Sequence, residues 1–244
     1  MKYFWNMFVI YFLILILVLG IIAKDIAITI IAGITGTIGV ILGAKGKISS
    51  FIIASINSIL YIIIALEGML LSSVILHAGF YIPMNIIGFA LWFKKRNNQG
   101  DVFARFLSIQ GIILVCVTLI LIWVSYSLIM INFTEAQNVW LDSFVLVESI
   151  IAVILMIFRY VDQWFLWLLV NFINLVMWII ILVNIENEAY EQSTAIIFII
   201  MHISYLINSI YGFLNWIKLN KNLQKQKPKQ LTYEELKQLS TKKK

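Results

Sequence analysis

The 244-residue sequence is poor in the residues on which most catalytic, redox and metal chemistry depends. It has one cysteine, Cys116, so no intrachain disulfide can form. Its two histidines lie far apart, which gives no metal-ligand spacing. No glycine-rich nucleotide loop, Ser/His/Asp set or carboxylate pair is evident, which argues against an enzyme and against ATP-driven transport. We therefore expect no catalytic residues, no metal and no cofactor.

Charge and proline are scarce as well. Charged residues make up 12% of the chain and there are two prolines, whereas hydrophobic residues make up 62%. The mean hydropathy is +0.97. Soluble domains are about half apolar, so the composition predicts an all-α membrane protein. A membrane β-barrel would instead need alternating segments of about ten residues.

Apolar runs that approach the roughly 20 residues needed to span a bilayer occur repeatedly. They lie at about 4–23, 26–44, 48–66, 69–93, 106–131, 139–158, 164–184 and 194–217, which predicts eight transmembrane helices. The first run could also be a signal peptide. It is long for one and has no obvious small-residue cleavage site, which favours a retained, peripheral helix within residues 1–24.

Basic residues between the runs predict the orientation. With the N-terminus inside and eight crossings, every Lys and Arg except Lys24 lies on the cytoplasmic side. Both termini are then cytoplasmic, and the chain ends in a basic tail at 218–244. Such a tail could bind nucleic acid. In a membrane protein, however, a solvated or lipid-facing tail is the simpler interpretation, so we expect no nucleic-acid partner.

One segment occurs twice. Residues 81–94 and 205–218 share Tyr, Gly, Phe, Trp and Lys in register, and in the helices before them Asn57 matches Asn171. The repeat predicts two three-helix bundles, 25–93 and 139–217, joined by a transmembrane helix and loops at 94–138. Because the joining helix returns the chain to its starting side, the two bundles are parallel repeats, as in SWEET transporters.

Polar residues within the apolar runs mark a candidate binding site, because polar groups in a bilayer are costly unless they are paired or line a water-filled path. One stripe at helical spacing, 3, 4, 3 and 4 residues apart, comprises Trp164, Trp167, Asn171, Asn174 and Trp178. Amides can bond ligand hydroxyls, and indoles can stack on a flat ring and attract a cation. Asn can also simply join helices, and a Trp can anchor at the membrane interface. The candidate substrate-binding residues are Trp164, Trp167, Asn171, Asn57, Asn85, Asn208, Tyr205, Asn174 and Glu148.

Glu148 has three interpretations that the sequence leaves open. It could attract a cationic substrate, carry a proton, or bond a neighbouring helix. Burial would disfavour its charged form unless a partner holds the charge.

Two sets of residues carry a family resemblance. The first comprises Lys45 to Ser49, Asn57, Tyr61, Tyr81 to Phe89 and Trp92, and the second comprises Asp142, Ser149, Gln163 to Trp167 and Asn171. Together they resemble the PnuC family of vitamin transporters over about residues 25–220. Trp-x-x-Trp followed by Asn four positions later is the most specific element. Asn85 stands where the family often has glutamine.

The resemblance implies a SWEET-like fold of two triplets around a joining helix in a bacterial cytoplasmic membrane. It implies facilitated diffusion of nicotinamide riboside by alternating access, with trapping by a cytoplasmic kinase that phosphorylates it. It places Trp164, Trp167 and Asn171 in the central site, and a homotrimer is a further expectation. Thiamine and deoxynucleosides, which relatives are thought to carry, are alternative substrates. A non-transporting membrane scaffold is the alternative from another class.

Overall fold

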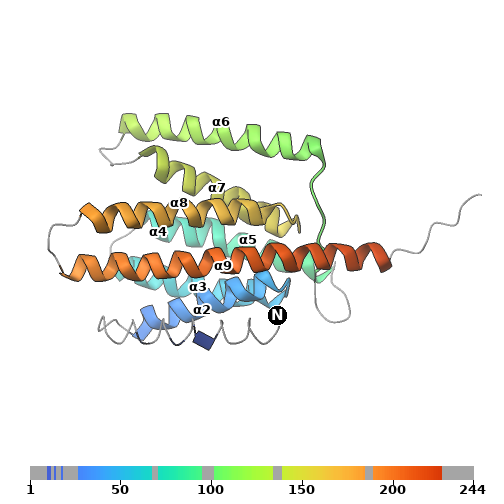
Figure 1. The fold of residues 1–244 in the computed structure, drawn as a ribbon, viewed down its shortest axis with the longest axis horizontal. Helices are drawn as coiled ribbons and strands as arrows, with labels where there is room; N and C mark the ends of the chain where they lie inside the picture. The colour runs from blue at the N-terminus through green and yellow to red at the C-terminus, as the bar shows by residue number, and fades with distance from the viewer. Residues whose placement is uncertain are drawn as a thin grey trace, which may run out of the picture.

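The computed structural model shows a bundle of nearly parallel α-helices (Figure 1). It describes residues 27–67, 71–94, 102–133, 139–184 and 189–226, and the single residues Ile10, Tyr11, Ile14 and Val18. The predicted span at 4–23 otherwise lies outside the described residues, as does the tail beyond residue 226.

The helices follow the apolar runs closely. They are α2 (Ala27–Ala44), α3 (Ser49–Glu67), α4 (Leu71–Leu76), η1 (His77–Tyr81), α5 (Ile82–Phe93), α6 (Ile109–Phe133), α7 (Val139–Ile157), α8 (Gln163–Asn184) and α9 (Ala189–Gln226). Among the described residues, six spans are long and apolar enough to cross a membrane, and Ile30–Ala44 is a shorter apolar helix. The chain is thus an all-helical, multi-span membrane protein, and the count of eight helices stays a prediction.

The predicted helix at 69–93 contains a π-helical turn, η1, between α4 and α5. The Ile82 N–H donates to the His77 carbonyl, five residues back. Pro83 follows directly and has no N–H to continue the α-helical pattern toward Gly79. Such π turns are frequent at functional sites.

Two helices end in the same way. The Gly46 N–H donates to Gly43 and the Lys47 N–H to Leu42, while the Arg159 N–H donates to Met156 and the Tyr160 N–H to Leu155. Both ends are Schellman motifs, which place one residue at positive φ. That residue is Gly46 (φ 69°) after α2 and Arg159 (φ 67°) after α7.

The helices pack in a reciprocal pattern. Within the two predicted three-helix bundles, which we call the two halves, α2 packs on α3 and α3 on α5, and α7 packs on α8 and α8 on α9. Between the halves, α2 contacts α9 and α5 contacts α7. Helix α6 packs on α7 at the outside of the bundle (Figure 1), and its apolar side chains, such as Leu114 (66% exposed), face outward.

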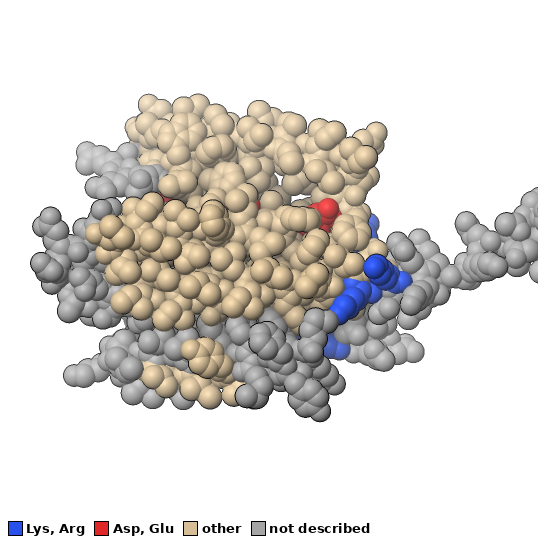
Figure 2. Space-filling model, in the orientation of Figure 1, with Lys and Arg blue, Asp and Glu red and all other residues tan. Residues whose placement is uncertain are grey.

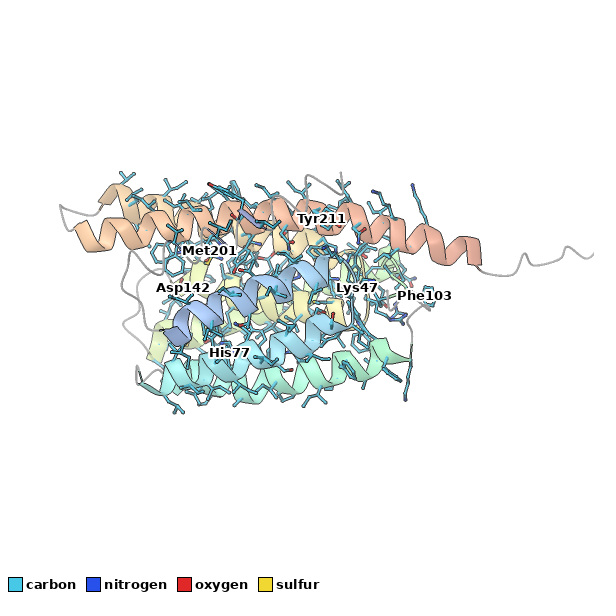
Figure 3. The ribbon with its side chains drawn as sticks, turned by 90° about the horizontal axis from the view of Figure 1, so that it is seen from below. Lys47, His77, Phe103, Asp142, Met201 and Tyr211 are labelled. Carbon is cyan, nitrogen blue, oxygen red and sulfur yellow. The ribbon has the colours of Figure 1, made fainter. Side chains whose placement is uncertain are left out.

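Residues 102–108 form an extended segment that links both halves at one end of the bundle. The Val102 N–H donates to Gly46 (2.9 Å), and the Arg105 backbone N–H donates to Arg159 (2.9 Å). The Asn220 amide of α9 donates to the Ala104 carbonyl (2.9 Å). We call this the basic end because Lys and Arg gather there (Figure 2). Lys47 and Phe103 lie at this end, and Asp142 lies toward the other (Figure 3).

Candidate functional site

Two tryptophans join the halves of the bundle at the basic end. Trp92 of α5 and Trp216 of α9 are fully buried, with ring centroids 5.5 Å apart. The Trp92 Nε1–H donates to the Ile157 carbonyl of α7 (3.1 Å). The Trp216 Nε1–H donates to the Gly43 carbonyl of α2 (3.0 Å). We call these two side chains and their two bonds the tryptophan clasp.

Trp164 packs beside the clasp rather than facing an opening. It is buried, and its ring meets that of Trp216 edge-on at a centroid distance of 5.9 Å. Gly212 leaves room for this indole, because a Cβ there would collide with the Trp164 ring. Trp167, one turn deeper along α8, is only partly buried at the edge of the same core. Trp167 is therefore the better placed of the two to reach a ligand.

Five of the predicted residues share one depth in the bundle. Asn57, Asn85, Glu148 and Asn171 each lie eight or nine residues from the basic-end terminus of their helix, and Asn208 lies eight residues before Trp216. With a rise of 1.5 Å per residue, this is roughly 12–14 Å from the basic end. A bilayer's hydrocarbon core is about 30 Å thick. The structure thus brings polar groups of five helices to about the middle of the bundle.

Asn171 is the centre of a polar cluster between α8 and α9. Its Nδ2 donates to the Trp167 carbonyl (2.7 Å) and to Ser209 Oγ (3.4 Å). Its Oδ1 lies 3.3 Å from His202 Nδ1, so this contact is a hydrogen bond when that nitrogen carries the proton. His202 and Ser209 are both buried. The cluster fixes the Asn171 amide in one orientation.

The matching amide in the other half has different partners. Asn57 Nδ2 donates to the Ala32 carbonyl (2.6 Å) and to Thr35 Oγ1 (3.1 Å) of α2. On nearly the opposite face of α2, Thr37 shares a side-chain hydrogen bond with Tyr205 of α9. The two halves are therefore linked by polar contacts at mid-depth as well as by the clasp.

Two midplane residues are buried without partners. Both amide atoms of Asn208 and both carboxylate oxygens of Glu148 lack a hydrogen bond within the described part of the chain. Glu148 is fully buried and Asn208 is 3% exposed. Unmade hydrogen bonds of buried groups cost about 1–3 kcal/mol each, and more for a charge. Such groups are candidates for contacts that a bound ligand completes.

The remaining two candidates are less constrained. Asn174 is half-buried and donates to the Val170 carbonyl of its own helix (2.8 Å). Asn85 is half-buried on α5. The structure therefore brings Asn57, Asn171, Asn208, Tyr205 and Glu148 into the interior, with Trp167 and Asn85 at its edge.

The sequence analysis missed an aromatic stack near the polar groups of the midplane. Tyr61 of α3 stacks on His77 of η1 at a centroid distance of 4.9 Å and an interplanar angle of 5°. His77 also contacts Tyr81 (5.1 Å). The π turn rotates these side chains toward α3. Pro83, shortly after His77, was the only signal of that turn.

The described interior holds polar and aromatic groups, with no cluster of metal-ligating side chains. No three His, Cys, Asp or Glu side chains cluster in the residues that the structure describes. Every Lys and Arg within the described ranges lies at the basic end, so the midplane holds amides, hydroxyls, aromatic rings and one carboxylate. These groups can hold a polar, flat and positively charged small molecule.

Comparisons with known proteins agree with this description. The model of the family described as nicotinamide mononucleotide transporter matches residues 26–218. A nicotinamide riboside transporter PnuC of Neisseria mucosa is 30% identical over 196 residues, which cover 78% of this chain and 72% of the relative. One of Haemophilus influenzae is 30% identical over 197 residues, covering 78% and 79%.

A solved structure has the same fold. The crystal structure of the vitamin B3 transporter PnuC superposes with a TM-score of 0.71 and 29% sequence identity. The match covers 90% of this chain and 92% of that one.

Proposed function

The chain belongs to the PnuC family of membrane transporters, matched by the nicotinamide mononucleotide transporter model, and we propose that it carries nicotinamide riboside by facilitated diffusion. The observation that carries the proposal is the set of ionisable groups at the midplane, where the carboxyl group of Glu148 is buried and no described Lys or Arg is near. Nicotinamide riboside is a pyridinium cation. The mononucleotide adds an anionic phosphate, for which the described residues of the interior provide no counter-charge.

The bound substrate would complete the contacts that the interior leaves unmade. The pyridinium ring would stack on Trp167, with Trp164 behind it, and its charge would face Glu148. The ribose hydroxyls would bond Asn171 and Asn208. Asn57, Asn85, Asn174 and Tyr205 would shape the remaining wall of the site.

The architecture would be two parallel triplets, 25–93 and 139–217, around the joining helix α6. Support comes from the reciprocal contacts, because the first helix of each triplet meets the third helix of the other. The two hydrogen bonds of the clasp join the same helix pairs, α5 to α7 and α9 to α2. Alternating access would follow from rocking of the triplets, in which the clasp is made when the basic end is closed and broken when it opens.

Orientation and metabolic context complete the proposal. Eight helices with both termini inside place the basic end and the tail at 218–244 in the bacterial cytoplasm. Opening of the clasp would then release the substrate inward. Facilitated diffusion alone cannot concentrate a solute, so a cytoplasmic kinase that phosphorylates nicotinamide riboside would hold the product in the cell.

A binding panel on the purified protein tests the substrate. Isothermal titration with nicotinamide riboside, nicotinamide mononucleotide, thiamine, riboflavin and a deoxynucleoside should give the highest affinity for the riboside. Tighter binding of thiamine or a deoxynucleoside would assign the fold to that substrate instead. Absence of binding by every compound, together with absence of flux, would favour the scaffold.

A further inference from the structure

A small cavity at the basic end lies between two helix ends. It has a volume of about 110 Å³ and is lined by Leu91 and Lys94 at the end of α5 and by Ile157, Phe158 and Arg159 at the end of α7. On this measure one water molecule needs roughly 10–15 Å³, so the cavity has room for a phosphate-sized group. Its lining is mostly apolar, and its two cations, Lys94 and Arg159, are the polar residues that border it.

The cations of this cavity lack counter-charges. Of the five N–H donors of the Arg159 guanidinium, one bonds the Phe103 carbonyl (3.3 Å), and no carboxylate pairs with it in the described residues. Burial lowers the pKa of Arg159, and the nearby charge of Arg105 lowers it further. Lys94 is exposed and likewise has no partner in that part of the chain. The site therefore holds positive charge that nothing described neutralises.

Arg159 also occupies a backbone position that favours glycine. Its φ of 67° lies in the left-handed region, which costs a non-glycine residue roughly 1–2 kcal/mol. At the equivalent helix end in the other half, the residue is Gly46. Strain of this kind is a reason to look for a role of the side chain.

The apolar side of the cavity adjoins exposed apolar surface. Phe158 is 46% exposed, and Leu91 continues into Ile87, one turn deeper on the same face of α5 and also exposed. A basic surface that suits a phosphate therefore adjoins an apolar surface that suits an acyl chain. Both lie at the end of the helices, the level expected for lipid headgroups. Basic pockets between membrane helices bind anionic headgroups on this pattern.

We propose that this cavity binds an anionic phospholipid of the phosphatidylglycerol type, with its phosphate held by Lys94 and Arg159 and its acyl chain along Leu91 and Phe158. The lipid would brace α5 against α7, the two helices that the Trp92 bond joins. The proposal is independent of the substrate.

The test measures lipid binding to the full chain in detergent. Native mass spectrometry and thermal shift would compare phosphatidylglycerol, phosphatidylcholine and inorganic phosphate. The variants are Lys94→Gln and Arg159→Gly, the second chosen because glycine adopts φ 67° without strain. Lys218→Gln, an exposed basic residue on α9, is the matched control.

We expect one tightly retained phosphatidylglycerol per subunit, preferred over phosphatidylcholine. Each cavity variant should lower the affinity for phosphatidylglycerol about fivefold, which is the effect of one basic residue at a membrane surface. Lys218→Gln should leave this affinity unchanged. Equal retention of the two lipids, or an unchanged affinity in both cavity variants, would overturn the proposal. An equal thermal shift with inorganic phosphate would also overturn it, because the acyl chain would then contribute nothing.

Discussion

The tryptophan clasp makes a quantitative prediction about access to the midplane. Replacing Trp92 and Trp216 by Phe removes the two indole N–H donors and keeps most of the aromatic packing. A buried hydrogen bond contributes about 0.5–1.5 kcal/mol, so the pair contributes about 2 kcal/mol to the closed basic end. If the clasp is broken in the open state, the double variant shifts the equilibrium toward opening by about 30-fold.

The assay is the labelling rate of a single cysteine behind the clasp. Cys116 is exposed and would be replaced by Ser, and Met84, which packs at the edge of the core beside Asn85, would become the reporter Met84→Cys. A membrane-impermeant thiol reagent is added to vesicles that expose the basic end. We expect labelling at least ten times faster in the Trp92→Phe/Trp216→Phe variant than in the parent.

Trp123→Phe is the matched control. Its Nε1–H also donates to a backbone carbonyl, that of Trp140 (2.8 Å). This bond joins α6 to α7 and does not connect the two predicted triplets. Equal labelling rates in the parent, the control and the double variant would refute a gating role for the clasp. Thermal stability of all three shows that the proteins compared are folded.

Three further predictions concern the site and its frame. Trp167→Ala and Asn171→Ala should each lower nicotinamide riboside affinity several-fold in calorimetry, because a cation–π contact contributes roughly 0.5–2 kcal/mol and a buried hydrogen bond about 0.5–1.5 kcal/mol. Unchanged affinity in both variants would remove these residues from the site. Glu148→Gln should lower affinity for the riboside more than tenfold but leave its uncharged dihydro form nearly unaffected, and an equal loss for both would show that Glu148 acts by packing. Gly212→Ala should lower the free energy of unfolding by about 1–3 kcal/mol, because the added Cβ collides with the Trp164 ring. Gly79→Ala, with open space around the added Cβ, should not lower it. Similar melting temperatures of the two variants would contradict the packing described.

Long apolar runs with polar breaks made the helices predictable. Bounds near 49–67, 139–157 and 163–184 follow the runs within a few residues. The last helix was predicted to end near residue 217, yet α9 continues to Gln226, because the Asn220 amide holds its polar extension against the 102–108 segment. Hydropathy reports the membrane part of a helix and says nothing about a polar continuation.

Side-chain partners were less predictable than positions. The shared stripe of Asn171 and Trp167 on α8 follows from their spacing, but the link of Asn171 to His202 and Ser209 depends on how α9 rotates against α8. The sequence repeat places Trp92 and Trp216 at equivalent positions. Their exchange of bonds with Ile157 and Gly43 depends on contacts between halves, which a sequence repeat alone does not show.

The measurement that tests the central claim most directly is flux in proteoliposomes that contain only this protein. We predict saturable uptake of labelled nicotinamide riboside that needs neither ATP nor an ion gradient, stops at equal concentrations inside and outside, and is not matched by nicotinamide mononucleotide. Absence of riboside flux from folded protein, or faster flux of the mononucleotide, would contradict the account.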